Sequence, residues 1–176
     1  MKKYVILASV LLTLAGCSAS AAVATTPHVV TKSVAVSKQV LSLDTLRLQM
    51  NKSNMQKVIT RLKAQVHKTY YVFSGDSPRG WDCSGLVVWT YKQLGLTLPH
   101  SATAQAHLGT KVNEPKIGDI VVFGYKGSYY YDHSGIYIGD GKVINANKYY
   151  GTTVIEPLSN FKYYSNIRFI RVLPMA

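Results

Sequence analysis

The chain has 176 residues, 47% of them hydrophobic, and carries a formal net charge of +12. This length suits a single domain with one buried core, and the thirteen tyrosines favour a β-rich or mixed domain over an all-helical one. The sequence contains no metal-ligand cluster of recognisable spacing and no glycine-rich phosphate loop, so we expect no metal and no other cofactor. The charge suits nucleic acid, an anionic membrane or an acidic wall polymer, and does not choose among them.

The first residues have the pattern of an export signal. Lys2 and Lys3 precede an apolar run, Tyr4–Leu14, which is too short to span a bilayer but has the length of a signal-peptide core. Small residues then precede Cys17, and this junction resembles the lipobox of bacterial lipoproteins. The resemblance implies that residues 1–16 are a signal peptide and that the Cys17 sulfur carries a diacylglycerol. An ordinary secretory signal that contains a cysteine is the alternative.

A lipid anchor gives the chain a cellular location. Acyl chains on Cys17 would hold the protein on a membrane after export, so we expect a membrane and a wall polymer as partners and no nucleic acid. In lipoproteins, Ser18 at the position after the cysteine implies sorting to the outer membrane if the host has one. Cys83, the second of two cysteines, is then unpaired in an oxidising compartment, which calls for a chemical role or burial.

Helices are expected in the first part of the domain. Residues 17–50, rich in Ala, Ser, Thr and Val up to about residue 42, read as a flexible tether, and the domain occupies residues 51–176. A helix capped by Ser53 or Asn54 is predicted from apolar residues at helical spacing, which are Met55, Val58, Ile59, Leu62 and Val66. After a turn-rich loop at 74–80, a second helix is predicted from Cys83 to Gly95, followed by a short one after Pro99.

The second half of the chain has the pattern of short strands. Segments rich in β-forming residues alternate with turns, and Gly139-Asp140-Gly141 predicts a hairpin. The predicted strands are 120–123, 135–138, 142–146, 152–155 and 167–172. Helices followed by antiparallel strands indicate an α+β fold.

Three segments carry the residues of a thiol catalyst. Cys83 at a helix N-terminus would have a lowered pKa, because the helix dipole and free N–H groups favour the thiolate. His133 begins one strand and Asn145 lies on the next. Cross-strand contact would place the Asn145 carboxamide against one imidazole nitrogen and leave the other for Cys83, which is the arrangement of papain-like catalysis. Asn147, on the same face of the strand, is the next candidate for the third residue.

These motifs together resemble the NlpC-type peptidoglycan peptidase family. They follow one another in the family's order over roughly residues 55–173, and are Tyr71–Gly75, Asp82–Val87, Leu98–Ser101 with Gln105, Gly118–Phe123, His133–Gly139 and Ile144–Ala146. The resemblance implies a papain-like α+β fold with helices packed on a small antiparallel sheet. It also implies a cysteine endopeptidase that cuts stem peptides of the wall between γ-D-glutamyl and the following L-diamino acid.

The resemblance also implies roles for particular residues. Cys83 is the nucleophile, His133 the base and Asn145 the third polar residue. Tyr71 matches a tyrosine beside the nucleophile, and Asp82 and Ser84 match positions that in some members recognise the free amine of the stem peptide. Capping of the helix, for Asp82 and Ser84, and core packing, for Tyr71, are the alternatives.

The sequence departs from the family pattern at four places. Asn145 stands where His is common, His100 where Arg is common, Ser74 where a second Gly is common, and Ser134 where an apolar residue is common. These departures concern substrate contacts more than the Cys83–His133 pair. Two other functions therefore stay open, namely a non-catalytic wall-binding lipoprotein, and an amidase or acyl transferase on the same fold.

Overall fold

A computed structural model describes residues 27–176, with side chains for residue 40 and for residues 42–176. The predicted signal peptide, Cys17 and Ser18 lie outside the described residues. The chain divides into two units, Met1–Lys38 and Gln39–Ala176, and the second contains the sheet, the core and the predicted site. No helix within residues 27–176 has both the length and the apolar character that crossing a membrane requires.

Helix α1, Pro27–Lys63, begins much earlier than the sequence predicted. The predicted caps Ser53 and Asn54 lie inside it, and residues 27–50 are helical where we expected a flexible tether. Proline is tolerated in the first turn of a helix, and no Gly or Pro interrupts the following residues up to Lys63. The tether was inferred from composition, and the helix from an apolar stripe, which reports where a helix packs and not where it begins.

The apolar stripe itself is confirmed. Met55, Val58, Ile59 and Leu62 are all less than 5% exposed, and Val66 packs beside them. These residues recur at helical spacing and so share one face of α1, which is buried in the main core.

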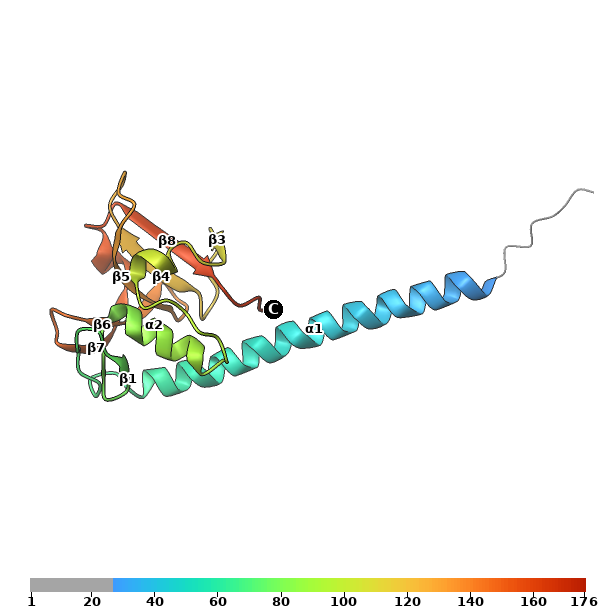
Figure 1. The fold of residues 1–176 in the computed structure, drawn as a ribbon, viewed down its shortest axis with the longest axis horizontal. Helices are drawn as coiled ribbons and strands as arrows, with labels where there is room; N and C mark the ends of the chain where they lie inside the picture. Colours follow the sequence, from blue (N-terminus) through green and yellow to red (C-terminus); the bar gives the residue numbers. More distant parts are fainter. Residues whose placement is uncertain (1–26) are drawn as a thin grey trace, which may run out of the picture. The chain divides into compact units, whose positions relative to one another are not determined.

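An antiparallel sheet of six strands, in the order β3-β8-β4-β5-β6-β7, forms the centre of the fold (Figure 1). Its strands are β3 Thr110–Val112, β4 Ile120–Gly124, β5 Tyr131–Tyr137, β6 Lys142–Asn147, β7 Thr152–Pro157 and β8 Asn166–Arg171. All five predicted strands are present. The sequence missed β3 and a small hairpin, β1 Asp76–Ser77 with β2 Gly80–Trp81, because two or three residues are too few to show alternation.

The predicted turn at 139–141 joins β5 to β6. Gly139, Asp140 and Gly141 have φ of 91°, 51° and 64°, and glycine and aspartate accept this left-handed region more readily than most residues. The turn fixes the register in which Ile136 pairs with Ile144. It therefore determines which residues of β6 lie beside His133.

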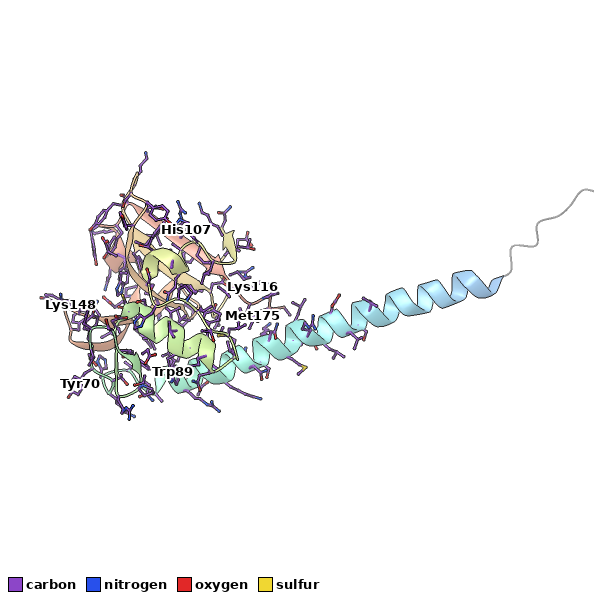
Figure 2. The ribbon with its side chains drawn as sticks, viewed as in Figure 1. Tyr70, Trp89, His107, Lys116, Lys148 and Met175 are labelled. Carbon is purple, nitrogen blue, oxygen red and sulfur yellow. The ribbon has the colours of Figure 1, made fainter. Side chains whose placement is uncertain are left out.

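Helices cover one face of the sheet and aromatic residues the other. Helices α2, Cys83–Lys92, and α3, Ala102–Gln105, pack with the C-terminal turns of α1 on the first face, where α2 contacts β5 and β6 (Figure 1). The second face carries Phe123 and Phe161, the latter from the 3-10 helix η1, Leu158–Phe161. At the C-terminal end, Lys116 Nζ donates to Met175 O at 3.3 Å (Figure 2). The fold is α+β, as predicted.

Candidate active site

Cys83 is the first residue of α2, and Asp82 caps this helix. The Asp82 backbone is extended, with φ −90° and ψ −175°, and its Oδ1 accepts the Gly85 N–H at 2.8 Å. The carboxylate thereby satisfies one of the free N–H groups of the first turn. A Cβ at position 85 would overlap the Gly75 carbonyl oxygen, so the 74–80 loop packs directly on this turn. Cys83 thus lies at a helix N-terminus, as the sequence predicted.

The pKa of Cys83 is raised, contrary to the lowered pKa that the sequence led us to expect. Burial of the thiol is the largest cause, and the negative charge of Asp82 adds to it. Hydrogen bonds to the sulfur from the backbone N–H groups of Ser134, Ser84 and Cys83 oppose the rise and do not offset it. Desolvation disfavours the charged thiolate more than the helix N-terminus favours it. The resting site therefore holds a neutral thiol at pH 7.

This pKa determines how the thiol reacts with an alkylating agent. In a Cys17→Ser variant, in which Cys83 is the single thiol, we expect the rate of reaction with iodoacetamide to keep rising with pH beyond the ordinary thiol pKa of about 8.5. The rate is followed by intact mass from pH 5 to 10. A rate that levels off near pH 6 would instead show a thiolate stabilised by an imidazolium.

His133 lies on β5 with one ring nitrogen already engaged. Its Nε2 lies 3.0 Å from Asn145 Oδ1, and its ring is stacked at 5.9 Å on Phe161 and tilted at 5.6 Å to Phe123. Burial lowers the pKa of His133, while the Asn145 hydrogen bond and the charge of Glu156 oppose this. The imidazole is therefore neutral at pH 7 and can act as a base. Ser134, the residue next to His133, is joined through Gln105 to the Ser84 carbonyl beside Cys83, which holds this part of β5 at the start of α2.

Asn145 is fully buried on β6, and a glycine makes room for it. A Cβ at Gly135 would lie 3.0 Å from the Asn145 Cβ and 2.8 Å from Val143 Cγ2, closer than such atoms normally approach. The small residue on β5 thus lets the carboxamide reach back toward His133. Asn147 makes different contacts, because its Nδ2 donates to Glu156 and its Oδ1 accepts from the Tyr149 N–H. Of the two asparagines, the geometry favours Asn145 as the partner of His133.

Removing the Asn145 carboxamide tests its role. We expect Asn145→Ala to lower kcat by about tenfold to a hundredfold, as for one supporting hydrogen bond of about 1–3 kcal/mol. The loss should appear in kcat more than in KM, since the group acts on the geometry of the imidazole. Asn145→His should keep substantial activity, because a second imidazole can also hold His133. Wild-type kcat in Asn145→Ala would mean that another residue orients the imidazole.

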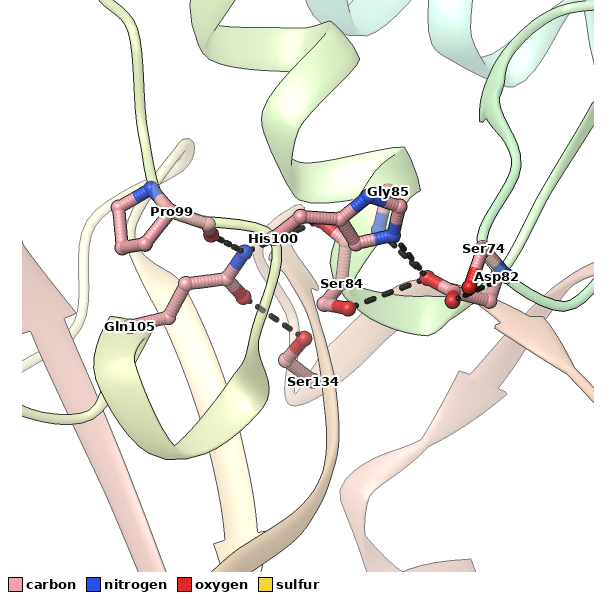
Figure 3. A network of polar contacts seen from close by, with 8 residues as sticks. All are labelled: Ser74, Asp82, Ser84, Gly85, Pro99, His100, Gln105 and Ser134. Atoms are coloured by element: carbon pink, nitrogen blue, oxygen red, sulfur yellow. Dashed lines mark hydrogen bonds and ion pairs between the residues drawn. The ribbon is translucent and has the colours of Figure 1, made fainter.

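Asp82 is the centre of a polar network at the start of α2 (Figure 3). Its Oδ1 contacts His100 Nε2 at 2.8 Å and accepts the Ser84 hydroxyl at 3.1 Å, in addition to the Gly85 N–H. Its Oδ2 accepts the Ser74 N–H at 2.9 Å. Burial alone would raise the pKa of Asp82, but these hydrogen bonds and the nearby His100 lower it. The carboxylate is charged and its Oδ1 is fully occupied within the protein.

These contacts bear on the predicted substrate-binding residues. Ser84 is buried and its hydroxyl is used on Asp82, so only Oδ2 of Asp82 retains capacity for a further donor. Tyr71 is half-buried, and burial together with the charges of Cys83 and Asp82 raises the pKa of its phenol. Its hydroxyl stays protonated beside the thiol, where it can donate a hydrogen bond.

Two buried polar residues complete the site. Gln105 on α3 donates to the carbonyls of Ser84 and Pro99 and accepts the Ser134 hydroxyl, which ties α2 to β5 (Figure 3). Glu156 on β7 accepts the Asn145 Nδ2 at 3.1 Å. Gln105 belongs to a family motif but had no predicted role, and Glu156 was not predicted. No signal in the sequence indicated Glu156, because an apolar Ile155 beside a charged Glu156 predicts the reverse of the burial that the structure has.

Comparison with known proteins decides the family. Residues 68–172 match the model of the NlpC/P60 family. The chain belongs to the NlpC/P60 family. Its first 18 residues also match the prokaryotic membrane lipoprotein lipid attachment site. No three His, Cys, Asp or Glu side chains within the described part of this NlpC/P60 protein are grouped as metal ligands would be.

Curated relatives of this NlpC/P60 chain include named peptidoglycan endopeptidases. The bifunctional muramidase/DL-endopeptidase CwlT of Bacillus subtilis is 42% identical over 82 residues, which is 44% of this chain and 25% of that protein. The murein DD-endopeptidase MepH of Escherichia coli is 38% identical over 106 residues, covering 54% of this chain and 39% of that protein. The chain thus spans less than half of the length of either relative.

Solved structures confirm the fold. An NlpC/P60 family protein of Bacillus cereus covers 68% of this chain and 40% of its own, with a TM-score of 0.61 and 28% identity. RipD of Mycobacterium tuberculosis, described as a non-catalytic domain adapted to peptidoglycan binding, covers 68% of this chain and 97% of its own, with a TM-score of 0.56 and 21% identity. At that identity, RipD supports the fold alone.

Proposed function

We propose that this protein is an exported, lipid-anchored cysteine endopeptidase that cuts peptidoglycan stem peptides. The observation that carries the proposal is the pair of contacts around His133: Asn145 Oδ1 lies 3.0 Å from its Nε2, and Gln105 joins the next residue, Ser134, to the Ser84 carbonyl beside Cys83. A nucleophile, a base and an orienting amide thus come from α2, β5 and β6. Residues 51–176 form the catalytic domain, and residues 17–50 connect it to the anchor.

Cys83 and His133 are both neutral before the reaction, so the thiol proton is transferred during the attack. His133 Nδ1 accepts the Cys83 proton as the sulfur attacks the peptide carbonyl, which forms a tetrahedral intermediate and an imidazolium. The N–H groups of Cys83 and Ser84, which face the sulfur before the reaction, can turn to the oxyanion as the sulfur becomes bonded to carbon. Collapse breaks the C–N bond, and the leaving amine takes the proton from His133. Water then attacks the thioester, with His133 again as base, and releases the acid and the thiol.

We assign the cut to the bond between γ-D-glutamyl and the L-diamino acid. Tyr71 and the free side of Asp82 Oδ2 are the groups near the thiol that can meet the amine of the stem peptide. The relatives differ on this point, because CwlT is named a DL-endopeptidase and MepH a DD-endopeptidase. Digestion of purified peptidoglycan followed by mass analysis separates the two. The proposed cut exposes the amine of the diamino acid, whereas a DD cut converts cross-linked dimers to monomers without shortening any stem.

A non-catalytic wall-binding role is the second candidate, because RipD is described as such an adaptation of this fold. Binding requires neither a nucleophile nor a base, and Cys83 and His133 are both present here. Digestion products that depend on Cys83 would exclude binding alone. Products that carry a new acyl linkage, or that lack the sugar at the peptide N-terminus, would indicate the acyl transferase or the amidase.

The anchor is tested at Cys17. We expect Cys17→Ser to release the protein from membranes or to block removal of the leader, because no sulfur remains for the diacylglycerol. Detergent partitioning of cell fractions measures this, with Cys83→Ala as the matched control that should stay membrane-bound. Unchanged partitioning of Cys17→Ser would show that Cys17 is not acylated. Delivery to an outer membrane is supported by Ser18 alone.

A further inference from the structure

Glu156 is a buried carboxylate that is held by three asparagine side chains. It is 7% exposed, its Oε2 accepts Nδ2 of Asn145 at 3.1 Å and of Asn147 at 2.9 Å, and its Oε1 lies 3.4 Å from Asn160 Nδ2. Among the described residues, no Lys, Arg or His forms an ion pair with it. Burying a carboxylate without a counter-ion is unfavourable unless its oxygens are hydrogen-bonded, as they are here.

Glu156 determines which way the Asn145 carboxamide faces. An asparagine side chain can rotate to exchange its oxygen and its NH2, but an ionised carboxylate only accepts hydrogen bonds. Glu156 therefore requires Nδ2 of Asn145 on its own side and turns Oδ1 toward His133. An amide oxygen also only accepts, so His133 Nε2 carries the proton and Nδ1 keeps its lone pair. This is the tautomer that a base for Cys83 requires.

We propose that Glu156 is a positioning residue for catalysis, which fixes the Asn145 carboxamide and through it the tautomer of His133, and whose charge stabilises the imidazolium formed during thiol attack. The proposal deepens the proposed function and rests on it. Asn147 and Asn160 brace the carboxylate from β6 and η1, so Glu156 does not depend on Asn145 for its own position.

The charges around His133 are few. Glu156 approaches from β7 through Asn145 and Asp82 lies before α2, while the rings packed on His133 carry no charge. The negative charge of Glu156 opposes the lowering of the His133 pKa by burial. Removing this charge should therefore lower that pKa further.

Glu156→Gln separates charge from shape. The glutamine carbonyl oxygen can accept both Asn145 and Asn147, while its NH2 meets only the long contact to Asn160, so the variant should fold. We propose to follow the His133 imidazole by NMR titration in the full chain with Cys83→Ala, which requires no substrate. The titration midpoint should move to lower pH in Glu156→Gln. Asp132→Asn is the matched control, because Asp132 is exposed and adjacent to His133 in sequence, and it should leave the midpoint unchanged.

The NMR result separates this proposal from the proposed function, since it does not depend on which bond is cut. An unchanged His133 midpoint in a folded Glu156→Gln protein overturns the role of the charge. An equal shift in Asp132→Asn would also overturn it, because any nearby acid would then suffice.

Kinetics test whether Glu156 acts through Asn145. We expect Glu156→Gln to lower kcat on the order of tenfold, with KM unchanged and the acidic limb of the pH profile moved to lower pH. Glu156→Ala, which also removes the acceptor that orients the Asn145 carboxamide, should lower kcat much less in the Asn145→Ala background than in the wild-type background, because no carboxamide remains to be positioned. A loss of kcat as large in the Asn145→Ala background as in the wild-type background would show that Glu156 acts independently of Asn145 and would overturn the positioning role.

Discussion

Cys83→Ala should reduce wall hydrolysis by at least about a thousandfold, because it removes the atom that forms the acyl-enzyme. The loss should appear in kcat with purified peptidoglycan as substrate and fragments measured by mass. Folding should be little affected, since alanine is well accepted in the first turn of a helix and the N-cap contact of Asp82 with Gly85 does not involve the side chain of residue 83.

The matched control is the other cysteine. Cys17→Ser removes the other cysteine sulfur, which lies outside the catalytic domain, so the purified variant should retain full hydrolysis. A Cys83→Ala protein that still released the same fragments would remove Cys83 from the mechanism. Loss of hydrolysis in Cys17→Ser as well would show that the anchor is required in addition to the nucleophile.

Arg171→Ala should destabilise the domain by about 3 kcal/mol, since it leaves a buried carboxylate without its counter-ion. Asp119, which precedes β4, is completely buried. Its carboxylate accepts hydrogen bonds from Arg171 Nε at 3.0 Å and Nη2 at 2.7 Å. Arg171 Nη2 also donates to the Glu114 carbonyl at 3.0 Å. The ion pair ties the end of β8 to the beginning of β4, and the strands behind the site depend on this junction.

Urea denaturation measures the change in the free energy of unfolding. Arg171→Lys should restore only part of the stability, because an ammonium cannot match the two parallel hydrogen bonds of the guanidinium. Arg79→Ala is the control, since Arg79 is exposed and its removal should cost less than about 0.5 kcal/mol. A loss below about 1 kcal/mol in Arg171→Ala would show that water replaces the guanidinium at Asp119.

Most of the fold could be predicted from local signals in the sequence. The buried face of α1 from Met55 to Leu62, the start of α2 at Cys83 and the turn at Gly139–Gly141 all follow from spacing, capping and left-handed backbone within a few residues. These signals are short in range, so they can be read from the sequence directly. They failed where a segment was too short to show a period, as in β3, or where a helix continued beyond its packed face, as in α1.

The candidate site, like the fold, could be predicted from the sequence only in part. Cys83, His133 and Asn145 could be chosen from their motifs and from the hairpin that brings β5 beside β6. Two features could not: the occupied Oδ1 of Asp82 and the buried carboxylate of Glu156. Each depends on which side chain a strand or loop presents to residues distant in sequence.

The Cys83 thiol shows most directly which properties follow from the sequence and which follow only from the folded packing. The position of Cys83 at the start of a helix follows from the residues around it, and this position favours a thiolate through the local N–H groups. The burial of the sulfur beside the carboxylate of Asp82 is a product of the folded packing, and it raises the pKa of the thiol. Desolvation depends on every atom that packs around a group, whereas a helix N-terminus is determined by a few neighbouring residues. The identity of the nucleophile and its position at the start of α2 could therefore be predicted from the sequence, but the protonation state of its thiol could not.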